Sequence, residues 1–141
     1  AVYESAAALR RGDEIVAIDD ARGLEYSGYQ QYLKTRAGGE VTLTVKREGD
    51  MLLQIAVPVS DEGKLGAEDV RTIVEGLDPV ALVACDAFAA ETLSAAYRTP
   101  VTLDADNRLL GRTAVIFQDF EGMMNTPADK QRAWALLKKL R

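Results

Sequence analysis

The acidic side chains of this sequence that could do chemistry occur as two closely spaced pairs. Asp119 and Glu121 follow a predicted strand, and a carboxylate pair could serve acid–base chemistry of the kind found in glycoside hydrolysis. Asp104 and Asp106 have the i, i+2 spacing of a calcium-binding loop, but the glycine and the glutamate that such a loop requires further along are absent. A solvated turn is therefore the favoured interpretation of residues 104–108, and neither pair predicts a catalytic or metal site.

Histidine is absent from the 141 residues, and a single cysteine, Cys85, is present. The lack of histidine excludes from this chain the Ser-His-Asp and Cys-His catalytic pairs, HExxH zinc sites and any histidine-ligated metal. Cys85 has no second cysteine with which to form an internal disulfide, and its apolar surroundings predict a small buried hydrophobe. We therefore expect neither a metal site nor a cofactor in this chain.

The net charge of −5 and the hydrophobic content of 48% are ordinary for a globular chain with a real core. There is no basic footprint for nucleic acid. Five basic residues between Lys130 and Arg141 lie on a predicted helix, where a solvated face is favoured over a lipid or nucleic-acid patch. The longest apolar run, Val80 to Cys85, is too short to span a bilayer. The chain begins with alanine and lacks a signal-peptide layout, so we expect a piece of a longer protein.

The first half alternates short helices and short strands. Alanines after Ser5 favour a helix, and strict alternation of apolar residues from Val41 to Val45 favours a half-buried strand. Pro58 suits the edge of a sheet, where a missing N–H is tolerated. The expected elements are a helix of about two turns from Ser5 to Gly12, a strand at Ile15–Ile18, a helix from Ser27 to about Arg36, and two hairpin strands at Val41–Val45 and Met51–Val59.

The composition changes near residues 67 to 70, which predicts a division into residues 1–67 and residues 68–141. The second half is expected to form a smaller α/β region, either packed on the first half or separate from it. Its expected elements are a helix through Val70, Ile73 and Leu77, an alanine-rich helix from Asp78-Pro79 to about Tyr97, strands at Val101–Leu103 and Thr113–Phe117, and a last helix after Thr126 with Trp134, Leu137 and Leu140 on its apolar face.

The stretch from Leu9 to Asp20 predicts a sharp corner between a helix and a strand. Gly12 can adopt the left-handed backbone of a helix C-cap, and Asp13 can bond back to nearby amides. The corner belongs to a longer pattern, AAALRRGDEIVAID at residues 6–19, which is followed by a helix and then by VTLTVKREG at residues 41–49. With this pattern, residues 1–67 resemble a bacterial PDZ domain, although Asp19-Asp20 replaces the family's common Asn-Gly. The ending EGKLGA, residues 62–67, is most similar to PDZ domains of membrane-embedded site-2 metalloproteases, and those of serine proteases are close competitors.

The resemblance implies an α+β fold: a small PDZ-like β-sandwich or barrel with two helices. It also implies a site where an extended peptide adds to an exposed strand edge beside a helix. Because little of the chain precedes the first helix, we expect a circularly permuted arrangement, in which the strand comes from the C-terminal side. The expected peptide-binding residues are Lys64, Leu65, Gly66 and Ala67 on that strand, with Tyr29, Tyr32 and Leu33 on the helix. The three helix residues would equally suit a plain core, and Gly66 would equally suit a turn.

The function implied by the resemblance is that of a non-catalytic peptide- or protein-binding module in a bacterial extracytoplasmic protease, on the periplasmic or envelope side, which engages or gates substrate. The parent would be a metalloprotease or a serine protease. The alternative is an architectural PDZ-like interaction domain of an envelope or secretion assembly. A third interpretation assigns residues 68–141 to an enzyme whose histidine-bearing part lies outside this sequence.

Overall fold

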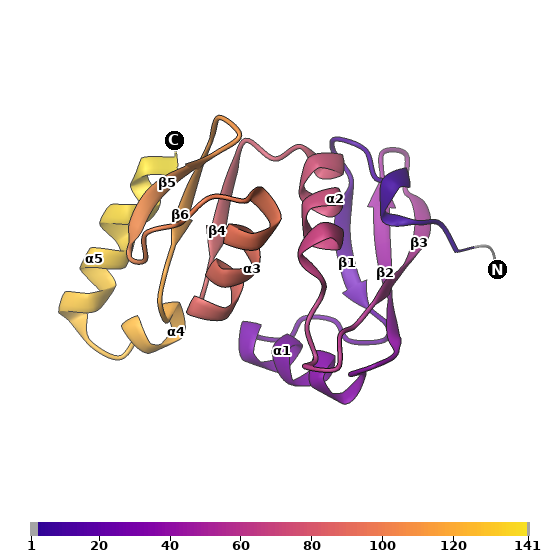
Figure 1. Ribbon diagram of the computed structural model, residues 1–141, viewed down its shortest axis with the longest axis horizontal. Coiled ribbons are helices and arrows are strands. Elements are labelled where there is room, and N and C mark those ends of the chain that lie inside the picture. The colour runs from indigo at the N-terminus through magenta and orange to yellow at the C-terminus, as the bar shows by residue number, and fades with distance from the viewer. Residues whose placement is uncertain (1–2, 141) are drawn as a thin grey trace. The chain divides into compact units, whose positions relative to one another are not determined.

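The computed structural model describes residues 3–140, apart from the side chain of Tyr26 (Figure 1). The chain forms two compact units, which divide between Asp78 and Pro79. Unit 1 precedes this division and unit 2 follows it. The fold class is α+β, as predicted, with one three-stranded sheet in each unit.

Unit 1 is built around an antiparallel sheet in the order β1-β2-β3. Its elements are a 3-10 turn η1 (Ala6–Ala8), β1 (Glu14–Ile18), α1 (Tyr26–Thr35), β2 (Glu40–Arg47), β3 (Met51–Pro58) and α2 (Ala67–Leu77). The described strands form an open sheet and not a closed barrel. The three predicted strands are confirmed, because alternation on β2 and β3 sends every second side chain into the core.

The core of unit 1 lies on one face of this sheet. Leu43 and Val45 of β2 pack there with Ile55 and Val57 of β3, and Ile73 of α2 covers them. The division between the units therefore follows α2 instead of preceding it, because α2 buries its apolar face in unit 1.

Unit 2 contains a mixed sheet in the order β4-β6-β5. Strands β4 and β6 run parallel, and β5 and β6 form an antiparallel hairpin. The elements are β4 (Ala81–Ala84), α3 (Ala87–Tyr97), β5 (Ala105–Leu109), β6 (Arg112–Ile116), α4 (Phe120–Met123), α5 (Pro127–Leu137) and a 3-10 turn η2 (Lys138–Leu140). Its core includes Phe117, Met123 and Ala133.

Three local predictions are wrong. The helix expected from Ser5 to Gly12 is one 3-10 turn, because Leu9 is extended and the Asp13 carboxylate accepts the N–H of Arg10 instead. The helix expected from Pro79 to Tyr97 is interrupted by β4, which pairs with β6. Val101–Leu103 does not form the expected strand. The strand of this region is β5, which begins at Ala105, inside the turn predicted at residues 104–108.

Candidate functional site

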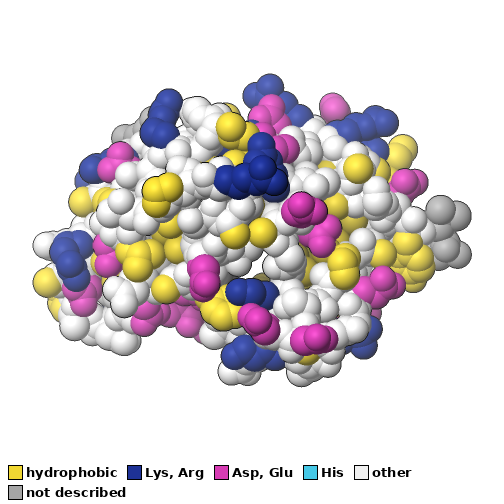
Figure 2. All heavy atoms as spheres, viewed as in Figure 1, with side chains coloured by type: hydrophobic (Ala, Val, Ile, Leu, Met, Phe, Trp, Pro, Cys, Tyr) yellow, Lys and Arg dark blue, Asp and Glu magenta, His cyan; other side chains and the backbone are white. Residues whose placement is uncertain are grey.

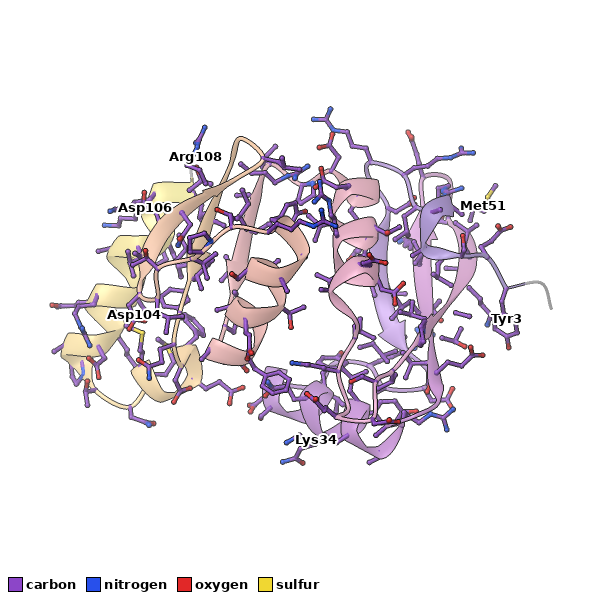
Figure 3. The ribbon with its side chains drawn as sticks, in the orientation of Figure 1. Tyr3, Lys34, Met51, Asp104, Asp106 and Arg108 are labelled. Carbon is purple, nitrogen blue, oxygen red and sulfur yellow. The ribbon has the colours of Figure 1, made fainter. Side chains whose placement is uncertain are left out.

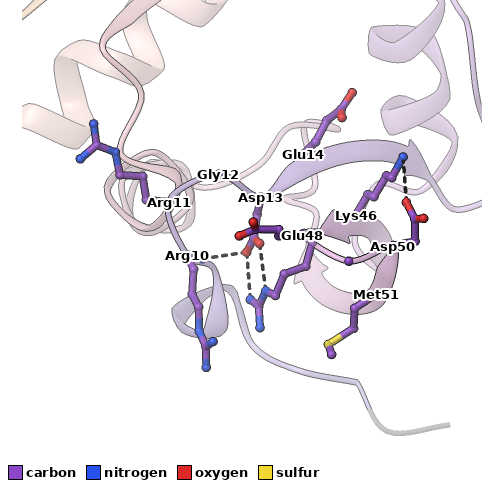
Figure 4. A pocket seen from close by; sticks show the side chains of 11 residues that line it. Arg10, Arg11, Gly12, Asp13, Glu14, Lys46, Glu48, Asp50 and Met51 are labelled. Atoms are coloured by element: carbon purple, nitrogen blue, oxygen red, sulfur yellow. Dashed lines mark hydrogen bonds and ion pairs between the residues drawn. The ribbon is translucent and has the colours of Figure 1, made fainter.

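The two motifs of the PDZ-like pattern meet at one partly buried ion pair. The guanidinium of Arg47, at the end of β2, donates to both carboxylate oxygens of Asp13 at 2.9 Å and also to the carbonyl of Ala8 at 2.9 Å (Figure 4). The N–H of Arg10 donates to the same carboxylate at 2.8 Å. The side chains of Asp13 and Arg47 are 1% and 15% exposed. This pair therefore ties the corner at Gly12 to the β2–β3 hairpin.

The hydrogen bonds from Arg47 hold the pKa of Asp13 below its ordinary value, although burial opposes this effect. Because the folded-state pKa is depressed, the stabilisation is present above the unfolded-state pKa of about 3.9 and is lost as the pH falls through the folded-state pKa. We expect acidification below about pH 4 to destabilise the wild type more steeply than an Asp13→Asn variant, which lacks this titrating group. Urea unfolding at a series of pH values measures the two slopes, and equal slopes would contradict the expectation.

A hollow of about 950 Å³ opens beside the Asp13–Arg47 pair, between the corner and the β2–β3 hairpin (Figure 4). Its charges balance, because four basic and four acidic side chains line it: Arg10, Arg11, Lys46 and Arg47, with Asp13, Glu14, Glu48 and Asp50. The lining has no cysteine, serine or histidine that could act as a nucleophile or base. Two opposite pairs of this lining interact with each other: Asp13 with Arg47 at 2.9 Å, and Lys46 with Asp50 at 3.4 Å.

The segment from Lys64 to Ala67 enters a helix, and it does not form the expected strand. Leu65 makes a single antiparallel bridge with Val59 and packs against the core. Gly66 is the N-cap of α2, and Ala67 is the first helical residue. Lys64 lies in the preceding turn, where its ammonium is 3.7 Å from the carboxylate of Glu62. Few backbone groups of this segment are left to pair with an added peptide.

Tyr29, Tyr32 and Leu33 lie half-buried on α1. The hydroxyl of Tyr32 donates to the carboxylate of Asp19, which also accepts the N–H of Thr42 at 2.7 Å. This hydrogen bond to Asp19 raises the pKa of Tyr32. The hydroxyl of Tyr29 accepts the N–H of Leu24 at 3.2 Å. Both tyrosines thus have a structural task, which is to fix the chain between β1 and α1.

The turn before Lys64 approaches the end of α1 closely, at Gly63 and Lys34. A Cβ built on Gly63 would lie 2.7 Å from the Cα of Lys34, the residue after Leu33 on α1. Gly63 also has a positive φ of 79°, which suits glycine. The contact is therefore between two backbones, and it leaves no room for a peptide at that point.

The outer edge of β3 is a second candidate for strand addition, and the sequence did not point to it. Glu4 pairs with this edge in parallel: its N–H donates to the carbonyl of Gln54 at 2.8 Å, and its carbonyl accepts the N–H of Ala56 at 3.1 Å. Since alternate residues of a strand face the same side, Leu52 also directs its backbone groups outward. Among residues 3–140, only Glu4 pairs with this edge.

Three apolar side chains on or next to this edge are exposed. Tyr3, Met51 and Leu52 are 54%, 57% and 63% exposed. Figure 3 shows Tyr3 and Met51 on the outer side of β3, and Met51 also lines the hollow. The one sequence signal for this edge was Pro58. Proline lacks an N–H, and an edge strand tolerates this loss on its outer side. We call Tyr3, Glu4, Leu52 and Gln54 the β3 edge site.

The candidate chemical residues of unit 2 are engaged in structure. The carboxylate of Asp119 accepts the N–H of Gly122 at the start of α4, and Asp106 is ion-paired with Lys139 at 3.0 Å. Burial, followed by the nearby acidic groups, raises the pKa of the half-buried Cys85 thiol. Within the described residues, no group of three or more acidic or cysteine side chains is placed to hold a metal ion.

The function of this chain has to be argued from its own residues, because no similar protein is found. No family model, no curated protein and no solved structure matches the chain. None of the helices described between residues 3 and 140 is both long enough and apolar enough to cross a membrane.

Proposed function

We propose that unit 1 is a non-catalytic, PDZ-like module that binds an extended peptide or protein segment by β-strand addition. Following the PDZ resemblance, we place it in a bacterial extracytoplasmic protease, where it would engage or gate the substrate. Support for the PDZ-like part comes from Asp13 and Arg47, which lie in the two separate motifs of the resemblance and join in one ion pair.

The observation that carries the proposal is the pairing of Glu4 with β3. Glu4 makes two backbone hydrogen bonds to the outer edge of β3, and this pairing supports strand addition there. Main-chain bonds of this kind provide affinity in strand addition, while side-chain contacts provide selectivity. Next to Glu4, the exposed side chains of Tyr3 and Leu52 offer apolar contacts to alternate residues of an incoming strand. The β3 edge is therefore our preferred site, and the groove predicted at Lys64–Ala67 is the competing one.

Replacing Gln54 with proline tests the β3 edge. The N–H of Gln54 faces the outer edge and not β2, so its loss removes a donor to the peptide without removing a bond of the β2–β3 ladder. We expect amide signals of Leu52 and Gln54 to shift when the wild type is titrated to millimolar concentration with a peptide of alternating valine and lysine. In Gln54→Pro, the affinity should fall by roughly tenfold, measured from the shift at Leu52.

Gln54→Thr is the matched control, because threonine keeps the N–H and favours strands. It should bind the peptide like the wild type. Shifts confined to Lys64–Ala67 and to Tyr29, Tyr32 and Leu33 would move the binding site to the predicted groove. The absence of shifts at both places would contradict the proposed function.

A further inference from the structure

Trp134 occupies an unexpected side of the last helix. The sequence predicts that it shares an apolar face with Leu137 and Leu140, but its side chain is 58% exposed. The inward face of α5 is formed instead by Ala133, which is 1% exposed, with Leu136 and Leu137 packed against the unit 2 core. A large aromatic side chain is therefore exposed to solvent. The side chains that α5 contributes to the core are small or aliphatic.

Two lysines flank this tryptophan along the helix. Lys130 lies four residues before Trp134, and Lys138 lies four residues after it, so all three occupy one stripe of the surface. The ammonium of Lys138 is 5.6 Å from the centre of the indole ring. Among the described residues, neither lysine is ion-paired with an acid, whereas Arg132 is paired with Asp129 and Lys139 with Asp106. We call Lys130, Trp134 and Lys138 the Trp134 stripe.

The charge of the protein is divided unequally between the two units. The sequence up to Asp78 has nine basic and fifteen acidic residues, a net charge of −6, and the sequence from Pro79 has eight basic and seven acidic residues, a net charge of +1. The acidity of the whole chain is thus a property of unit 1. Unit 2 is by itself close to neutral, and Lys130 and Lys138 add two positive charges to its surface beside Trp134.

We propose that the Trp134 stripe docks unit 2 on the surface of a bilayer that contains anionic phospholipids. The indole ring has an apolar body and one N–H donor, a combination that favours the headgroup region of a membrane. The aliphatic stems of Lys130 and Lys138 can lie along the same apolar boundary while their ammonium groups reach the lipid phosphates. An acidic protein or a nucleic acid would satisfy the lysines, but neither requires a lone tryptophan between them. This interaction is independent of peptide binding at the β3 edge.

The intrinsic fluorescence of the protein provides a direct test, since Trp134 is the single tryptophan of the chain. Vesicles of phosphatidylcholine with about 30 mol % phosphatidylglycerol should shift its emission to shorter wavelength, and about 0.5 M salt should reverse the shift. Pure phosphatidylcholine vesicles should bind much more weakly. A Lys130→Gln/Lys138→Gln variant should lose roughly 25-fold in affinity, since each lysine near an anionic surface contributes about fivefold.

The matched control is Arg10→Gln/Arg22→Gln, which removes the same charge from exposed positions of unit 1. It should bind the anionic vesicles like the wild type. The proposal is wrong if the emission does not shift, if neutral vesicles bind equally well, or if both double variants lose the same affinity. A shift with polyglutamate or duplex DNA but not with vesicles would also overturn it and would assign the stripe to an acidic polymer.

Discussion

Replacing Asp13 with alanine should lower the free energy of unfolding of unit 1 by about 3 kcal/mol. Removing one partner of a buried ion pair leaves the other charge without compensation, and that is the costly way to break such a pair. Asp13 accepts two bonds from Arg47 and one from the N–H of Arg10, and its side chain is 1% exposed. The measurement is urea unfolding of the full chain, followed through the amide signals of β2 and β3.

Glu62→Ala is the control for the loss of a carboxylate. Glu62 is paired with Lys64 at 3.7 Å, but its side chain is 74% exposed. An exposed pair of this kind contributes little, so the change should be below about 0.5 kcal/mol. Similar losses of unfolding free energy for both variants would mean that the Asp13–Arg47 pair does not stabilise the contact between the corner at Gly12 and the β2–β3 hairpin.

Replacing Phe117 with alanine should destabilise unit 2 by about 3–5 kcal/mol. Phe117 follows β6, is 0% exposed, and packs against Phe120 with 5.0 Å between the ring centres. The substitution would remove a ring from the centre of the cluster and leave a cavity that its neighbours can fill only in part. Amide signals of β4 and β6 during urea unfolding report this transition separately from that of unit 1.

Val80→Ala provides the corresponding control in unit 2. Val80 is 83% exposed, so shortening its side chain should change the unfolding free energy by less than about 0.5 kcal/mol. A loss for Phe117→Ala no larger than this would contradict the view that unit 2 is organised around Phe117.

The strands of unit 1 could be predicted because their signals are local. Alternation identifies β2 from five residues of sequence, and the structure extends that strand only to Glu40–Arg47. Strand β4 could not be recognised in the same way. Its four residues, Ala81–Ala84, lie in an alanine-rich stretch that favours a helix, and they become a strand only by pairing with β6. Tertiary pairing thus overrides local preference at this point.

Strand addition stays a prediction, and the sequence did not point to the β3 edge as its place. Strand addition was expected from the resemblance. The choice of the β3 edge depends on the pairing of Glu4 with Ile55, which lies far along the chain. Such a long-range pairing cannot be predicted from local sequence. Trp134 illustrates a different limit. Helical spacing groups it with Leu137, but the small side chain of Ala133 determines which part of the helix fits against the core.

The division between the units has a chemical consequence, because it falls on the peptide bond between Asp78 and Pro79. Aspartyl–prolyl bonds are the peptide bonds most readily cleaved by mild acid, and this chain contains one. Acid treatment of the unfolded chain would therefore release the two units as separate fragments without any redesign of the gene. Their opposite net charges would then separate them on an ion-exchange column, so that each half could be refolded and assayed alone.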